Sequence, residues 1–164
     1  MNHDMFTHLY RFNCWANHRM LEAMKELAPS EFDRDLGGSF PSLHQTMLHM
    51  LWVEQLYFRR WRGLSTADIA QVPKLDSAAS IQSAWEDLEK EREAYLVRLT
   101  DEDLIQPIEY VDTRGRKLSM LLWQSLFHLI NHSTFHRGQA ISKLRQLGKE
   151  PPATDFVPFC RELT

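Results

Sequence analysis

Three histidines stand four residues apart near the end of the chain, in the segment LFHLINHSTFHRGQ: His128, His132 and His136. Residues four apart on an α-helix lie on one face, about 6 Å apart along its axis, so two imidazoles there can bind one metal ion at about 2.0–2.1 Å. Three successive turns are too long for one ion, and we favour His132 and His136. The alternative interpretation is a hydrogen-bonded histidine pair in a protein core.

A third ligand would have to come from another helix, and His49 in TMLHMLWVEQLYF is the candidate, on the flank of an apolar stripe. If its helix faces the one that carries His132 and His136, three nitrogens can converge and leave a fourth position for water or substrate. That arrangement is typical of catalytic zinc rather than closed structural zinc. Glu54 is the only general base that we can nominate. Glu54 and His128 are also candidates to hold the second ring nitrogen of a ligand.

Several other chemistries lack their motifs. No glutamate follows His132, so the H-E-x-x-H pattern of zinc proteases is missing, and no E-x-x-H pair supports a di-iron bundle site. The net charge is −3 and basic residues are scattered, which disfavours nucleic-acid binding. The first residues show no signal peptide, and no apolar run approaches the roughly 20 residues that span a bilayer. We therefore expect a cytoplasmic protein with neither nucleic acid nor membrane as partner.

Four long segments repeat apolar residues at spacings of three and four and are predicted to be helices. They run from about Asp4 to Leu27, from Ser42 to Arg62, from Asp76 or Ser77 to Leu99, and from Ser119 to Leu147. Ser42 and Gln45 fit a capping box, Ser119 is the expected cap of the last helix, and the run EDLEKERE is interpreted as a solvated face. Mutual burial of four apolar stripes predicts an all-α four-helix bundle, as one domain over residues 1–164.

Two shorter segments have other patterns. Alternation around Ile108, Tyr110 and Val111, followed by the turn Asp112-Thr113-Arg114-Gly115, predicts a short β-hairpin or an extended excursion before the last helix. The final segment DFVPFCREL is too apolar to remain in solvent, so we expect it to pack back onto the bundle.

Four segments resemble the DinB/YfiT-like family, a group of damage-inducible proteins classed with metalloenzymes. RFNCWANHRMLEAM is similar to the family's first helix with its WAN sequence, and SLHQTMLHMLWVEQLYFRRWRG to its second helix. NHSTFHRGQ is similar to the motif H-x-x-x-H-R-G-Q, and TDFVPFCRE to the family's end. The resemblance covers essentially the whole chain. It implies a bundle with a crossover connection, often a homodimer, and a divalent metal, zinc or nickel, held by His49, His132 and His136.

The same resemblance directs the functional expectation. Relatives include thiol-dependent transferases that use bacillithiol or mycothiol, and others proposed as hydrolases. We expect a metal-dependent enzyme that acts on a small molecule, with transfer to or from a low-molecular-weight thiol preferred. A metal-dependent hydrolase with Glu54 as base, or a non-catalytic metal-binding stress protein, are the alternatives. Arg137 follows the second ligand and is expected to pair with a carboxylate, in the bundle or across a dimer, rather than to act in catalysis.

Overall fold

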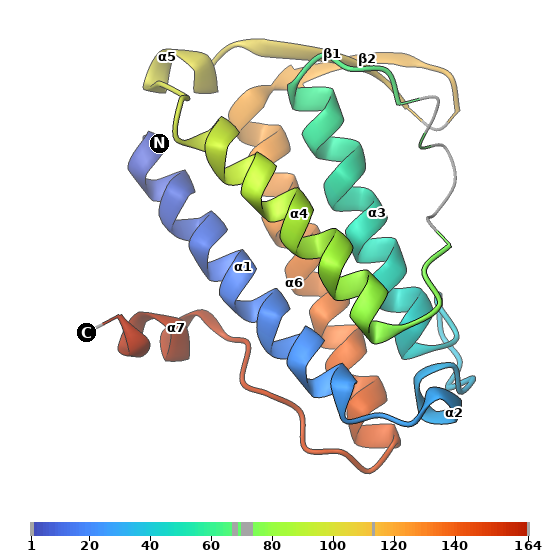
Figure 1. Ribbon diagram of the computed structural model, residues 1–164. Coiled ribbons are helices and arrows are strands. Elements are labelled where there is room, and N and C mark those ends of the chain that lie inside the picture. Colours follow the sequence, from blue (N-terminus) through green and yellow to red (C-terminus); the bar gives the residue numbers. More distant parts are fainter. Residues whose placement is uncertain (1, 67–68, 70–73, 113, 164) are drawn as a thin grey trace.

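The computed structural model describes residues 2–66, 69, 74–112 and 114–163. Four long helices form the bundle: α1 (His3–Lys25), α3 (Leu43–Trp61), α4 (Ala78–Leu96) and α6 (Leu122–Gln146). Shorter elements are α2 (Pro29–Phe32), α5 (Asp101–Leu104), β1 (Pro107–Val111), β2 (Lys117–Leu121) and α7 (Phe156–Glu162). The antiparallel hairpin β1–β2 lies across one end of the bundle (Figure 1). The predicted all-α four-helix bundle with a short hairpin is therefore confirmed.

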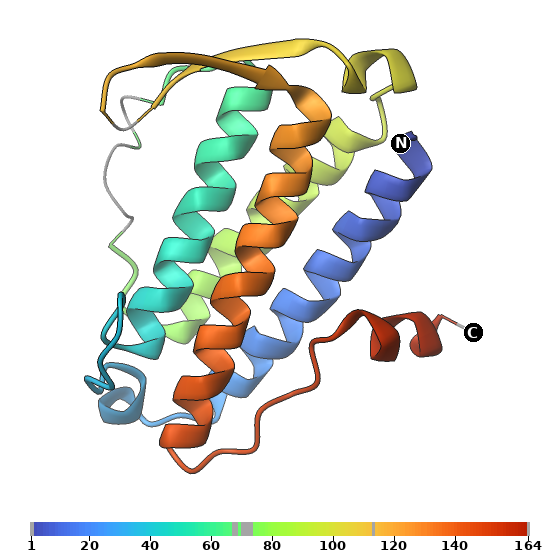
Figure 2. The same cartoon turned by 180° about the vertical axis from the view of Figure 1, so that it is seen from behind.

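Seen in cross-section, the four long helices occupy the corners of a square, with α1 and α3 at opposite corners. Helix α3 packs against α4 and α6, and α1 packs against the same two helices. Helices α3 and α4 run in the same direction, so the chain between them joins opposite ends of the bundle, whereas α6 runs antiparallel to α3 (Figure 1, Figure 2). This connection is the expected crossover. It makes α3 and α6 antiparallel neighbours, which brings their middle turns side by side.

The helix starts follow local capping chemistry. The Ser42 hydroxyl accepts a hydrogen bond from Gln45 N at 3.1 Å, which is one of the two bonds of the predicted capping box, and Ser77 caps α4 through Ser80 N at the same distance. After α3 the chain turns at Gly63, whose φ of +64° lies in the left-handed region that favours glycine. The boundaries of the bundle helices are therefore set largely by their own end residues.

Two sequence predictions about the third and fourth long helices were wrong. Ser119 does not cap α6, because it lies in β2 opposite Glu109, and the helix begins only after Leu121. The run EDLEKERE is not wholly solvated, because Arg92 within it is only 1% exposed. Residue 92 is on the same helix face as the buried Trp85 and Leu88, so helical period rather than charge decides its burial.

The final segment packs back onto the bundle as predicted. Phe159 of α7 is buried against Phe12 and Ala16 of α1, and Trp15 lies against the same cluster. The Trp15 indole N–H also donates to the Glu162 carboxylate at 2.7 Å. Across the part of the chain that the structure describes, no helix has both the length and the apolar character needed to cross a membrane.

Candidate metal centre

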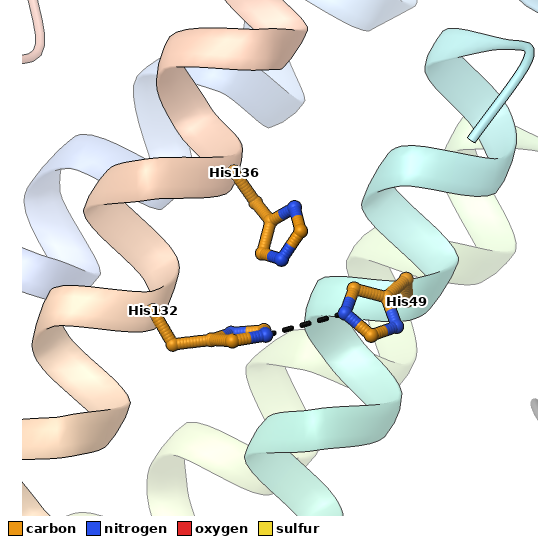
Figure 3. Close-up of side chains that lie close together, drawn as sticks. All are labelled: His49, His132 and His136. Carbon is orange, nitrogen blue, oxygen red and sulfur yellow. Dashed lines mark hydrogen bonds between the residues drawn. The ribbon is translucent and has the colours of Figure 1, made fainter. Parts of the chain in front are cut away.

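The structure brings together the three histidines that the sequence nominated. His49 comes from the middle of α3, and His132 and His136 come from successive turns of α6. Figure 3 shows their rings turned toward one another in the space between the two helices. One nitrogen from each ring lies within 4.8 Å of the other two, and the Nε2 atoms of His49 and His132 are 3.2 Å apart. The crossover makes this convergence possible, because it places α3 and α6 antiparallel.

The nitrogen geometry fits a tetrahedral metal. Two ligands bound tetrahedrally at about 2.0–2.1 Å are about 3.3 Å apart, close to the 3.2 Å between His49 Nε2 and His132 Nε2. The ligand group contains no cysteine and no carboxylate among the described residues. Three nitrogen donors without a fourth protein ligand would leave one coordination position for a small molecule.

Burial keeps these imidazoles neutral. Desolvation, followed by the nearby His136, lowers the pKa of His49 to about 4. Desolvation also lowers the pKa of His132 to about 3, with further contributions from His136, His49 and His128. The pKa of His136 is likewise lowered by burial, although its hydrogen bond with Gln139 opposes the change. Since a metal binds the neutral imidazole, all three rings have a lone pair available at neutral pH.

Two neighbours orient the rings. Gln139 Oε1 lies 2.8 Å from His136 Nδ1, which can donate its N–H and leave Nε2 as the lone-pair nitrogen. Phe40 stacks on His49 with ring centroids 4.2 Å apart, and the loop that carries Phe40 is held by Lys143 Nζ, which donates to Gly37 O at 2.7 Å. Sequence reasoning missed both contacts. The position of Gln139, three residues after His136 on the same helix, was the available signal.

A model of the DinB family matches residues 1–162. This chain belongs to the DinB family. Protein DinB of Bacillus subtilis (strain 168) is 27% identical over 158 residues, which span 93% of this chain and 92% of that protein. The crystal structure of a DinB-like protein from Bacillus cereus ATCC 10987 matches with a TM-score of 0.71 at 21% identity, over 93% of this chain and 97% of that one. The resemblance inferred from the sequence motifs is confirmed, and the structural likeness bears on the fold alone.

Glu54 of this DinB-family chain lies in a fully buried polar network. Its carboxylate accepts hydrogen bonds from Asn13 Nδ2 at 3.0 Å, Asn17 Nδ2 at 2.9 Å and Ser133 Oγ at 3.1 Å, and it forms an ion pair with Arg92. We call these residues, with Arg137, the Glu54 network. It joins α1, α3, α4 and α6 at the centre of the bundle.

This environment argues against Glu54 as the base. Burial alone would raise its pKa, but the charge of Arg92 and the hydrogen bonds from Arg92, Asn13 and Ser133 outweigh burial and lower it. A carboxylate with four donors and a lowered pKa accepts a proton poorly. Its contacts give Glu54 a structural role. Among the described residues, Glu54 makes no hydrogen bond to a histidine of the metal group.

Arg137 belongs to the same network. It donates to Asn13 Oδ1 at 2.6 Å and to Asn17 Oδ1 at 2.9 Å, and its other terminal nitrogen donates to Thr134 Oγ1 at 2.8 Å. Two asparagine oxygens thus take the place of the carboxylate partner that we expected. The amide groups of these asparagines connect the Arg137 guanidinium to Glu54, so the arginine of the H-R-G-Q motif holds α6 against α1.

His128 lies outside the metal group, in agreement with the helical spacing. Its exposed ring is 6.0 Å from that of His132 and 5.0 Å from that of Tyr57. His132 Nδ1 is buried without a hydrogen-bond partner among the described residues, so neither His128 nor Glu54 supports it in this arrangement.

Proposed function

We propose that this DinB-family protein binds one divalent metal ion, zinc or nickel, through His49, His132 and His136, and that the site serves a thiol-dependent transfer to a small electrophile. One observation carries the proposal: three imidazoles from two helices converge within 4.8 Å, with no carboxylate or cysteine in the group among the described residues. Such a donor set suits zinc and nickel and leaves a position for an exchangeable ligand.

A divalent ion in this site would hold a substrate thiol as the thiolate, which is its nucleophilic form. The chain supplies orientation and shielding. Gln139 fixes the ring of His136, Phe40 covers the face of His49, and the hydrogen bond from Ser133 to Glu54 joins α6 to α3. These contacts favour a rigid site over a flexible one.

The protein environment favours thiol transfer over the two alternatives. Hydrolysis needs a proton acceptor beside the attacking water, and Glu54, the nominated base, is occupied by four donors. A purely structural metal site is normally closed by a fourth protein ligand, whereas the described residues provide three. The family resemblance supplies the thiol as the preferred partner.

Metal analysis of protein purified without a histidine tag tests the ligand assignment. We expect about one divalent ion per chain in the wild type and a large loss in His49→Ala and His132→Ala. His18→Ala is the matched control, since His18 is half exposed on α1 and bonds Glu89 at 2.6 Å. Equal metal content in the wild type and His49→Ala would refute the assignment.

A thiol-consumption assay then tests the reaction. The metal-loaded protein is mixed with monochlorobimane and, in turn, cysteine, glutathione or bacillithiol, with ester and amide substrates as controls. We expect thiol-dependent conjugation that disappears in His132→Ala and on removal of the metal with a chelator. Ester or amide hydrolysis without any thiol would instead favour the hydrolase.

A further inference from the structure

Two neighbouring cavities, together called the groove here, extend from His132 toward the β-hairpin. Its first part is a cavity of 280 Å³ whose lining includes His132, His128 and Tyr57. Its second part is a cavity of 570 Å³ against the hairpin. The two cavities are adjacent, because both are lined by Trp52, Leu56, Arg60, Tyr110 and Asp112.

Arg60 is a buried cation between the two cavities of this groove. The side chain is only 7% exposed, and its guanidinium lies 5.0 Å from the ring centroid of Tyr57 and 4.4 Å from that of Tyr110. Nη2 donates to Val111 O at 3.2 Å, whereas Nε is buried without a partner among the described residues. Part of the hydrogen-bonding capacity of the guanidinium is therefore unused.

The charge of Arg60 is also unmatched within the described chain. No carboxylate there forms an ion pair with Arg60. Asp112 lines the same groove, but its carboxylate pairs with the Arg116 guanidinium at 2.8 Å and accepts from the backbone N–H groups of Arg114 and Arg116. The contacts of this buried guanidinium are the Tyr57 and Tyr110 rings, a hydrogen bond with the Tyr57 side chain and the Val111 carbonyl. These contacts do not supply a full negative charge, and the planar fork of arginine matches carboxylate and phosphate oxygens, so Arg60 is a strong site for an anion.

The distance between the metal-site histidines and Arg60 determines how long the ligand must be. A chain of neighbouring side chains joins the two: the Arg60 guanidinium is 5.0 Å from the Tyr57 ring, Tyr57 is 5.0 Å from the His128 ring, and His128 is 6.0 Å from the His132 ring. On α3, residues 49 and 60 lie on the same face, about 16 Å apart along the axis. A ligand that reaches from the histidines to Arg60 must be elongated, and its middle must pass aromatic side chains.

We propose that this groove is the substrate site and that Arg60 binds a carboxylate or phosphate group of an elongated small molecule. The reactive atom of this molecule lies at the three histidines, and its apolar or aromatic middle contacts Trp52 and Tyr57. The position of the reactive atom rests on the proposed function, whereas the anion site at Arg60 needs no metal.

Calorimetry on the metal-free wild-type protein tests the anion site, with octanoate, octyl phosphate and octanol as probes. We expect at least one anion to bind about tenfold more tightly than octanol, because one charge-assisted hydrogen bond contributes at least that factor. The tighter of the two anions identifies the preferred group. Equal affinities for octanol and both anions would overturn the proposal, without the need for any variant.

Two arginine variants locate the effect. Arg60→Gln should lose the preference for anions. Arg60→Lys keeps the positive charge and should keep part of the preference, and it replaces the glutamine variant in the test if that variant does not fold. Arg62→Gln is the matched control and should keep the full preference, since Arg62 is exposed and pairs with Glu91 at 3.2 Å. A preference that persists in a folded Arg60→Gln protein would place the anion elsewhere and refute the assignment.

The two proposals fail in different measurements. If His49→Ala retains as much metal as the wild type while octanoate still depends on Arg60, the metal assignment fails and the anion site stands. If metal content follows the histidines but octanol binds as well as octanoate, the anion site fails and the metal site stands.

Discussion

Replacement of Glu54 by glutamine separates its structural role from a catalytic one. Glu54→Gln keeps the size of the side chain but removes the charge that balances Arg92, which is 1% exposed, and presents an amide N–H₂ to the donors of Asn13, Asn17 and Ser133. Breaking a buried ion pair by changing one partner destabilises a protein by about 3–5 kcal/mol. At about 2–4 °C per kcal/mol for a chain of this size, the melting temperature should fall by roughly 10 °C.

Thermal and urea unfolding followed by circular dichroism measure this loss. Glu91→Gln is the matched control, because Glu91 is an exposed carboxylate on α4 that pairs with Arg62. Its effect should stay within about 0.5 kcal/mol, as for most surface changes. At a temperature where Glu54→Gln is folded, its metal content should equal that of the wild type.

The opposite pattern would refute this reasoning. If Glu54→Gln melts like the wild type but loses thiol conjugation or hydrolysis, Glu54 acts on the substrate and the network is not its main role. A folded Glu54→Gln protein without metal would show that Glu54 supports a ligand histidine.

The remaining predictions concern pH, ligand orientation, the tail and assembly. Because the pKa of Glu54 is lowered from its ordinary value of 4.5, its stabilisation is complete above that pH and is lost as the pH falls through the folded-state value; the stability gap to Glu54→Gln should therefore shrink in acid unfolding below pH 4.5. Gln139→Leu should weaken metal affinity about 10–100-fold in a chelator competition, with an unchanged melting curve of the metal-free protein. Phe159→Ala should release α7, seen as faster proteolysis after residue 150 while the bundle stays intact. The homodimer implied by the family resemblance predicts twice the chain mass in sedimentation velocity.

Local sequence determined the long helices and two of the three histidines of the candidate site. Helix periodicity and caps such as Ser42 depend on neighbouring residues, so the long helices could be predicted from the chain alone. The same is true of the pair His132 and His136, because the pitch of a helix fixes the relation of residues four apart. Ser119 was misplaced since a serine before an apolar run also fits a strand, and pairing with Glu109 decided between the two.

Packing between distant segments decided the rest. His49 and His132 are 83 positions apart in the sequence, so their approach is undetermined until the crossover sets α3 antiparallel to α6. Arg92 looked solvated within a charged run, but the buried Glu54 on another helix holds it inside the bundle. Arg60 likewise has its contacts with Tyr110 and Val111 because the hairpin folds over the end of α3. Periodicity determines which face a residue occupies, whereas the partner of that face depends on contacts that no local pattern encodes.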